Sequence, residues 1–138
     1  MDSADHSSDT LSARRRSFGD VVLDMETSIE RLLRSIESVA GKYDEILTRM
    51  KKLQNAGIIH ATPHWRQDKY LYLIYPMKLG QRTRKYIGAD RYKIKDALEA
   101  VKRVDEYEIL SQKLIHLEKV LSQGNDELKR VVQTLGRG

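Results

Sequence analysis

The sequence predicts an α+β protein, mainly α, in which two long helices form an antiparallel coiled-coil hairpin with a small antiparallel β-sheet at its tip. Helical apolar periods run over residues 20–56 and 94–138, and β-forming residues fill the stretch between them. Only 8 Gly and 2 Pro occur in 138 residues, which favours long uninterrupted elements. This length is typical of one domain.

Residues 20–56 follow a heptad pattern without a break. An apolar or aromatic residue occupies every a position (Val22, Ile29, Ile36, Tyr43, Met50) and every d position (Met25, Leu32, Val39, Ile46, Leu53). Such a run predicts a coiled coil. Leu33 and Leu47 at e positions widen the apolar stripe, which indicates contact with more than one other helix. Gly57 is suited to a left-handed residue that ends the helix, with Ile58 packing back on the last turn.

Residues 57–93 are expected to form a three-stranded tip. Strands are predicted at 61–66, 69–75 and 82–87, and Pro63 restricts the first strand to an edge of the sheet. The link 76–81 contains Gly80 and fits a hairpin loop. The tip should therefore carry an antiparallel sheet between the two helices.

The second helix, over 94–138, is expected to begin near Asp90 or Lys93. Residues 123–126, Gln-Gly-Asn-Asp, predict a kink or break near its end. Two helices of similar length around a small sheet favour an intramolecular hairpin. The alternative is that the helices diverge and that each pairs with another chain.

Residues 1–19 are expected to form a disordered basic and polar tail, because Leu11 and Phe18 are its only large apolar residues. The tail ends near the basic run Arg14-Arg15-Arg16. Neither a signal peptide nor an apolar stretch long enough for a bilayer is visible, so we expect a cytoplasmic protein without membrane contact.

The residue types argue against an enzyme. The chain has no cysteine, which excludes disulfides, thiolate catalysis and Cys-ligated zinc. His60 and His64 have no carboxylate cluster beside them, and neither a phosphate-binding Gly-rich loop nor a nucleophile motif is present. We therefore expect no catalytic residue, no metal site and no cofactor.

Positive charge is concentrated in the predicted tip. The whole chain carries +5, whereas residues 57–95 hold nine Lys and Arg against Asp68 and Asp90, a net +7. Trp65 and five tyrosines lie among these cations, a composition suited to phosphate contact and base stacking. The residues predicted to bind nucleic acid are Arg66, Lys69, Lys78, Arg82, Arg84, Lys85, Arg91 and Lys93. A simpler interpretation is that these cations protect sheet edges from aggregation.

Residues 80–88, Gly-Gln-Arg-Thr-Arg-Lys-Tyr-Ile-Gly, followed by 94–100, Ile-Lys-Asp-Ala-Leu-Glu-Ala, resemble the arm-type DNA-binding domain of phage and transposon integrases. The resemblance implies a three-stranded sheet that precedes a helix and enters the major groove. The stretch from Tyr70 to Ile87 with the following helix is also similar to uncharacterised coiled-coil proteins of bacteria and mobile elements. Those often carry a Cys-rich segment before the hairpin, and this sequence has none.

These observations predict a non-enzymatic DNA-binding accessory or regulatory protein of a mobile element, with duplex DNA and a second copy of the chain as partners and a recombinase or another protein as a possible further one. Alternatives are an adaptor whose helices bind a protein, and a binder of single strands or RNA. Apolar surface left outside a two-helix seam favours a homodimer. The residues predicted in the coiled coil and dimer are Ile29, Leu32, Leu33, Ile36, Val39, Ile46, Leu47, Leu114, Leu117 and Leu121.

Overall fold

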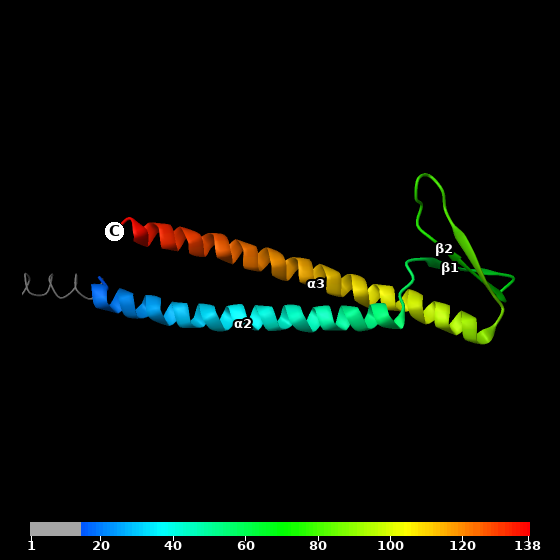
Figure 1. Ribbon diagram of the computed structural model, residues 1–138, viewed down its shortest axis with the longest axis horizontal. Helices are drawn as coiled ribbons and strands as arrows, with labels where there is room; N and C mark the ends of the chain where they lie inside the picture. Colours follow the sequence, from blue (N-terminus) through cyan, green and yellow to red (C-terminus); the bar gives the residue numbers. More distant parts are fainter. Residues whose placement is uncertain (1–14) are drawn as a thin grey trace, which may run out of the picture. The chain divides into compact units, whose positions relative to one another are not determined.

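A computed structural model describes residues 15–138 and confirms the predicted fold class, α+β and mainly α (Figure 1). The elements follow the order α2 (Phe18–Ala56), β1 (Thr62–Arg66), β2 (Tyr70–Ile74), β3 (Arg84–Gly88) and α3 (Arg91–Gly136). The chain divides into two compact units, residues 1–40 and 41–138, so α2 belongs to both. Each unit is described by itself below.

In the first unit, α2 begins two residues before the expected start. The backbone N–H of Asp20 donates to Ser17 Oγ at 3.0 Å, so Ser17 caps the helix and Phe18 is its first residue. Arg16 forms an ion pair with Asp24 at 2.7 Å, which raises the pKa of the Arg16 guanidinium. Residues 17–19 of the predicted tail therefore form the cap and the first turn of the helix, and Arg16 contacts its side, whereas residues 1–14 lie outside the described residues.

In the second unit, the end of α2 runs antiparallel to α3, as predicted for the hairpin. The Tyr43 hydroxyl donates to Glu118 Oε1 at 3.0 Å, whereas the Arg49 guanidinium donates to both carboxylate oxygens of Glu106 at 2.7 and 2.9 Å. Leu53, four residues after Arg49, is buried. Residue numbers rise along one helix as they fall along the other, which defines the antiparallel direction.

The end of α2 is held by α3. Gly57 adopts a φ of +100°, and its N–H donates to the carbonyls of Leu53 and Gln54 at 3.1 and 3.0 Å, as expected for a left-handed helix stop. Arg103 donates from Nη1 to the carbonyls of Ala56 and Gly57 at 3.2 and 2.9 Å. A cation thereby satisfies carbonyls at the negative end of the helix dipole.

The three strands form an antiparallel sheet in the order β1-β2-β3. Tyr72 in the central strand pairs with His64 on one side and with Tyr86 on the other. The pairing of β2 with β3 shifts between Leu71 and Tyr72, so that Leu71 faces Gly88, which adopts a φ of +102°. This β-bulge leaves Ile87 as an extra residue in β3 and turns the chain toward α3.

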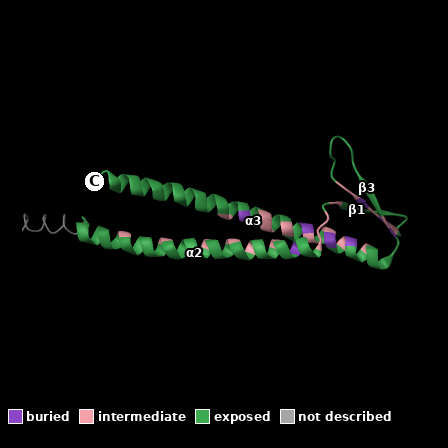
Figure 2. Ribbon diagram, viewed as in Figure 1, coloured by how far each residue is buried: buried purple, intermediate pink, exposed green. Residues whose placement is uncertain are grey.

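The core of this unit lies between the sheet and the first turns of α3 (Figure 2). Leu71 and Leu73 are fully buried, and Ala97 packs against them. The half-buried residues around this cluster come from the 58–61 link, the strands and α3: Ile59, Ala61, Tyr75, Ile87, Ile94, Leu98 and Val101. The sheet and α3 therefore share one small core.

α3 begins where the sequence places its cap and runs without interruption through the predicted kink. The Asp90 carboxylate accepts hydrogen bonds from the N–H groups of Tyr92 and Lys93 at 2.9 and 3.3 Å. The predicted kink at 123–126 is wrong, because the helix is continuous to Gly136. A single glycine inside a helix costs only about 1 kcal/mol relative to alanine, and no proline is present there to remove a hydrogen bond.

We expect Leu73→Ala to lower the free energy of unfolding by about 2–5 kcal/mol, because Leu73 is fully buried and its truncation leaves a cavity between the sheet and α3. Urea unfolding followed by Trp65 fluorescence measures this loss. Leu23→Ala on the exposed side of α2 is the control, with an expected change within about 0.5 kcal/mol. Equal effects of the two variants would contradict the placement of the core.

The Arg49–Glu106 pair makes stability depend on pH. The hydrogen bond from Arg49 holds the pKa of the Glu106 carboxyl below its ordinary value, so the pair stabilises the fold above the unfolded-state pKa, about 4.3, and is lost as the pH falls through the lower folded-state pKa. The melting temperature of Glu106→Gln should therefore lie below that of the parent at pH 7, and the two melting temperatures should converge at strongly acidic pH. Glu108→Gln, which removes an acid of the same helix, is the matched control. A difference that persists unchanged in acid would refute this role of the pair.

Candidate nucleic-acid interface

The sheet has two unlike faces, and α3 covers only one of them. Strand pairing puts Pro63, Trp65, Leu71, Leu73 and Lys85 on the side that faces α3. The other side carries eight residues that are half-buried or exposed: Thr62, His64, Arg66, Tyr70, Tyr72, Ile74, Arg84 and Tyr86. We call this second set the open face. Ile87 and Gly88, at the bulge, belong to the covered side.

Aromatic side chains form a row across the open face, in which the rings of Tyr70, Tyr72 and Tyr86 are in contact. His64, Tyr72 and Tyr86 are cross-strand neighbours, and the Tyr72 and Tyr86 rings lie 5.0 Å apart between centroids with an interplanar angle of 47°. The Tyr70 ring follows at 6.5 Å from the Tyr86 ring. Tyr86 keeps 56% of its surface exposed, so its ring is accessible to a ligand. Accessible rings of this kind can stack on bases.

Cations lie directly beside these rings. The Arg66 guanidinium is 5.7 Å from the centroid of the Tyr72 ring, and Lys69 Nζ is 5.8 Å from that of Tyr70. Arg84 lies opposite Ile74 on the same face. The contact with a tyrosine ring favours a fixed position for the Arg66 head group at the surface.

The eight cations predicted to bind nucleic acid do not share one surface. Arg66, Lys69 and Arg84 belong to the open face or its border, whereas Lys78 and Arg82 lie in the loop between β2 and β3. Lys85 lies opposite Leu73 and therefore on the side of the sheet that faces α3. Arg91 and Lys93 occupy the first turn of α3. All eight are exposed.

The tip cations also have no acidic partner in the part of the chain that the structure describes. Within residues 15–138, the ion pairs are Arg16–Asp24, Arg49–Glu106 and Arg103–Glu99, and all of them lie on or beside the helices. The cations of the strands and of the β2–β3 loop form no ion pair with a described acid. Their charge is therefore available to an anionic ligand.

The aromatic row includes residues that the sequence did not assign to a site. Alternation along 70–75 separates Tyr70, Tyr72 and Ile74 from Leu71, Leu73 and Tyr75, but it does not show which set is covered. The signal that could have decided it is the apolar character of Leu71 and Leu73, since a leucine pair is the better core. His60 and His64 are separated in the structure. His64 lies on the open face, whereas the His60 ring meets the Tyr107 ring edge-on at 6.4 Å between centroids.

The residues predicted for the coiled coil divide into a covered and an exposed set. In the second unit Leu114 is buried and Ile46 and Leu117 are half-buried, whereas Leu47 and Leu121 are exposed. In the first unit Leu32 and Val39 are half-buried, and Ile29, Leu33 and Ile36 are exposed. The e positions predicted to leave apolar surface therefore do so.

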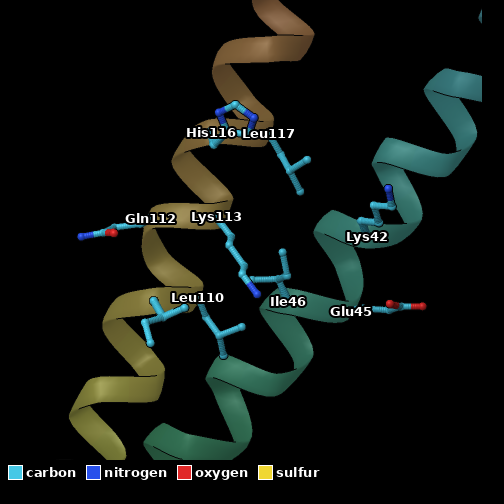
Figure 3. A pocket seen from close by; sticks show the side chains of 9 residues that line it. Lys42, Glu45, Ile46, Leu110, Gln112, Lys113, His116 and Leu117 are labelled. Carbon is cyan, nitrogen blue, oxygen red and sulfur yellow. The ribbon is translucent and has the colours of Figure 1, made fainter.

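A groove opens between α2 and α3 in the second unit. Its volume is about 590 Å³, and its floor is apolar. Figure 3 shows Ile46, Leu110 and Leu117 directed into the space between the helices, with Lys113 extending into it, while Glu45 and Gln112 point outward.

The described helices contain no stretch long and apolar enough to cross a membrane.

Comparison with protein-family models, with curated proteins and with solved structures finds no match to this chain.

Proposed function

We propose that this protein binds duplex DNA through the tip and acts, without catalysis, as an accessory or regulatory factor of a mobile element. The observation that carries the proposal is the set of exposed cations on and around the open face that form no ion pair with any residue of 15–138. Arg66 and Arg84 flank a row of rings on a sheet whose other face is fixed to α3. Cations on such a rigid platform suit a phosphate backbone better than isolated flexible side chains do.

Duplex DNA is favoured over other anions by the size and shape of the tip. The major groove of B-DNA admits a small ribbon of strands, and the cations of the open face and the β2–β3 loop would then lie near the phosphates on either side. Single strands remain the main competitor, because the Tyr72–Tyr86 row offers a stacking surface. An acidic protein is the third candidate ligand.

We further propose that the chain dimerises through its helices. The exposed apolar residues Leu47, Ile109 and Ile115 lie beside the groove between α2 and α3, and Val120 and Leu121 continue this apolar surface along α3. Covering this surface with a second copy would complete a four-helix arrangement. A dimer would also offer two basic tips to two half-sites on DNA.

Removal of open-face charge should weaken DNA binding in a salt-dependent way. If the tip neutralises about five phosphates, the logarithm of the affinity should fall with the logarithm of the salt concentration with a slope of roughly −4 to −5. Arg66→Ala combined with Arg84→Ala should make that slope shallower by about 1.8, because two phosphate contacts are lost. Filter binding to duplex DNA at several salt concentrations measures both quantities.

Two matched double variants test where the contact lies. Lys102→Ala with Lys119→Ala removes the same charge from α3 outside the tip and should leave the slope unchanged. Lys85→Ala with Arg91→Ala removes two positive charges from the tip but none from the open face. It should change the salt slope less than Arg66→Ala with Arg84→Ala does. The proposal fails if the open-face variant binds as the parent does. Stronger binding to single strands than to duplex DNA would favour the stacking alternative.

The dimer predicts a particle of twice the 16.0 kDa chain mass in light scattering at micromolar concentration. Leu47→Lys combined with Ile115→Lys should halve that mass, since both residues are exposed in the single chain and the substitutions leave its own core intact. Circular dichroism should show retained helix. A parent protein that is monomeric with full helix content would refute dimerisation.

A further inference from the structure

The β2–β3 loop ends in a tight turn with an unusual residue in it. Lys78 and Gln81 exchange two backbone hydrogen bonds of 2.9 Å, and the two central residues, Leu79 and Gly80, have φ values of +51° and +78°. Positive φ at both central positions defines a type I′ turn, for which Asn, Asp and Gly are preferred. A leucine with positive φ is strained, and relief of that strain would require only a different residue at position 79.

The strained leucine is also fully exposed. The Leu79 side chain is not buried against any part of the described structure, and Met77 in the same loop keeps 59% of its surface exposed. Pro76 and Met77 stand opposite the single residue Arg82, between the Tyr75–Thr83 and Lys78–Gln81 backbone contacts, so the loop is bent by a bulge before its apex. The loop projects beyond the sheet, away from α3 (Figure 1).

The second tight turn of the sheet provides a contrast. Gln67 and Asp68 between β1 and β2 both have a φ of +54°, and Lys69 N–H donates to the Arg66 carbonyl at 3.2 Å. This turn has the same form but carries polar side chains. An apolar apex is therefore a property of the β2–β3 loop and not a requirement of the turn.

The charges around Leu79 identify the class of ligand. Lys78, Arg82 and Arg84 flank the apex, and none of them has an acidic partner within residues 15–138. An apolar side chain surrounded by cations complements a polyanion with an apolar interior. Duplex DNA has this character, because phosphates line its surface and stacked bases fill its centre.

We propose that Leu79 is a wedge that inserts between base pairs of the bound duplex and bends it, while Lys78 and Arg82 contact the adjacent phosphates. This inference rests on the proposed DNA binding by the tip. Apolar wedges of this kind unstack a base step and kink the duplex by roughly 20–90°. Pyrimidine–purine steps, which unstack most easily, are the expected sites.

The experiment measures unstacking and bending at saturating protein. Duplexes that carry 2-aminopurine at a TA step report unstacking by a rise in fluorescence, and dyes at the two ends report bending by energy transfer. The parent protein should give both signals. Leu79→Asn places a favoured residue in the turn, so its melting temperature should be equal to or above that of the parent, whereas both DNA signals should be lost. The salt slope should stay the same, since no charge is removed.

Two control variants separate the wedge from the turn. Gln67→Asn places the same favoured residue at the corresponding positive-φ position of the β1–β2 turn and should leave unstacking and bending intact. Leu79→Met keeps an apolar side chain at the apex and should retain most of both signals. A stable Leu79→Asn protein that still unstacks and bends DNA would overturn the wedge.

The remaining outcomes distinguish the wedge from the proposed function. Parent protein that binds duplex DNA with the expected salt slope but produces neither signal overturns the wedge and leaves DNA binding standing. Parent protein that fails to bind duplex DNA overturns both. Binding to polyglutamate that is lost in Leu79→Asn, without any signal from DNA, would assign the apex to an acidic protein and overturn the wedge.

Discussion

The packing of Leu71 and Leu73 against the first turns of α3 is the contact on which the tip depends. These two are the largest fully buried side chains within residues 15–138, and Ala97 leaves room for the helix to approach them. Because β-strand side chains alternate, covering the face with the two leucines places Tyr70, Tyr72 and Ile74 on the opposite side of the sheet. The burial of these two leucines therefore determines that Tyr70, Tyr72, Tyr86 and Arg66 lie on the face away from α3.

The chain segments that enter and leave the sheet are also held in place through several independent contacts. Arg103 in α3 binds the carbonyls of Ala56 and Gly57 at the end of α2, and the Ile59 N–H donates to the Ala100 carbonyl at 3.1 Å. The Asp90 cap fixes the start of α3 directly after β3. Such contacts before the first strand and after the last restrict the motion of the sheet relative to α3. A restricted sheet suits the proposed role, in which charges are presented in a defined arrangement.

Two surfaces of the tip differ in what they offer a ligand. The open face combines rings with cations held beside them, an arrangement with the chemistry that the proposed phosphate contact and stacking require. The β2–β3 loop instead exposes apolar side chains among cations, with strain at its apex. The helices provide a third surface, an apolar groove with Lys113 in it, that suits association with another helix and explains why an adaptor role competes with DNA binding.

Sequence pattern alone determined the elements and their order, because the heptad of 20–56, the alternation of 70–75 and the Asp90 and Gly57 end signals are local properties of the chain. It also located the positive charge in the tip. Only the tertiary structure decided which sheet face is covered and that α3 passes through Gly124 without a break. It also revealed Leu79 in a left-handed conformation, where the loop pattern had indicated only a hairpin around Gly80. The reason is physical: periodicity states which residues lie on the same side, whereas burial and backbone conformation depend on what packs against that side.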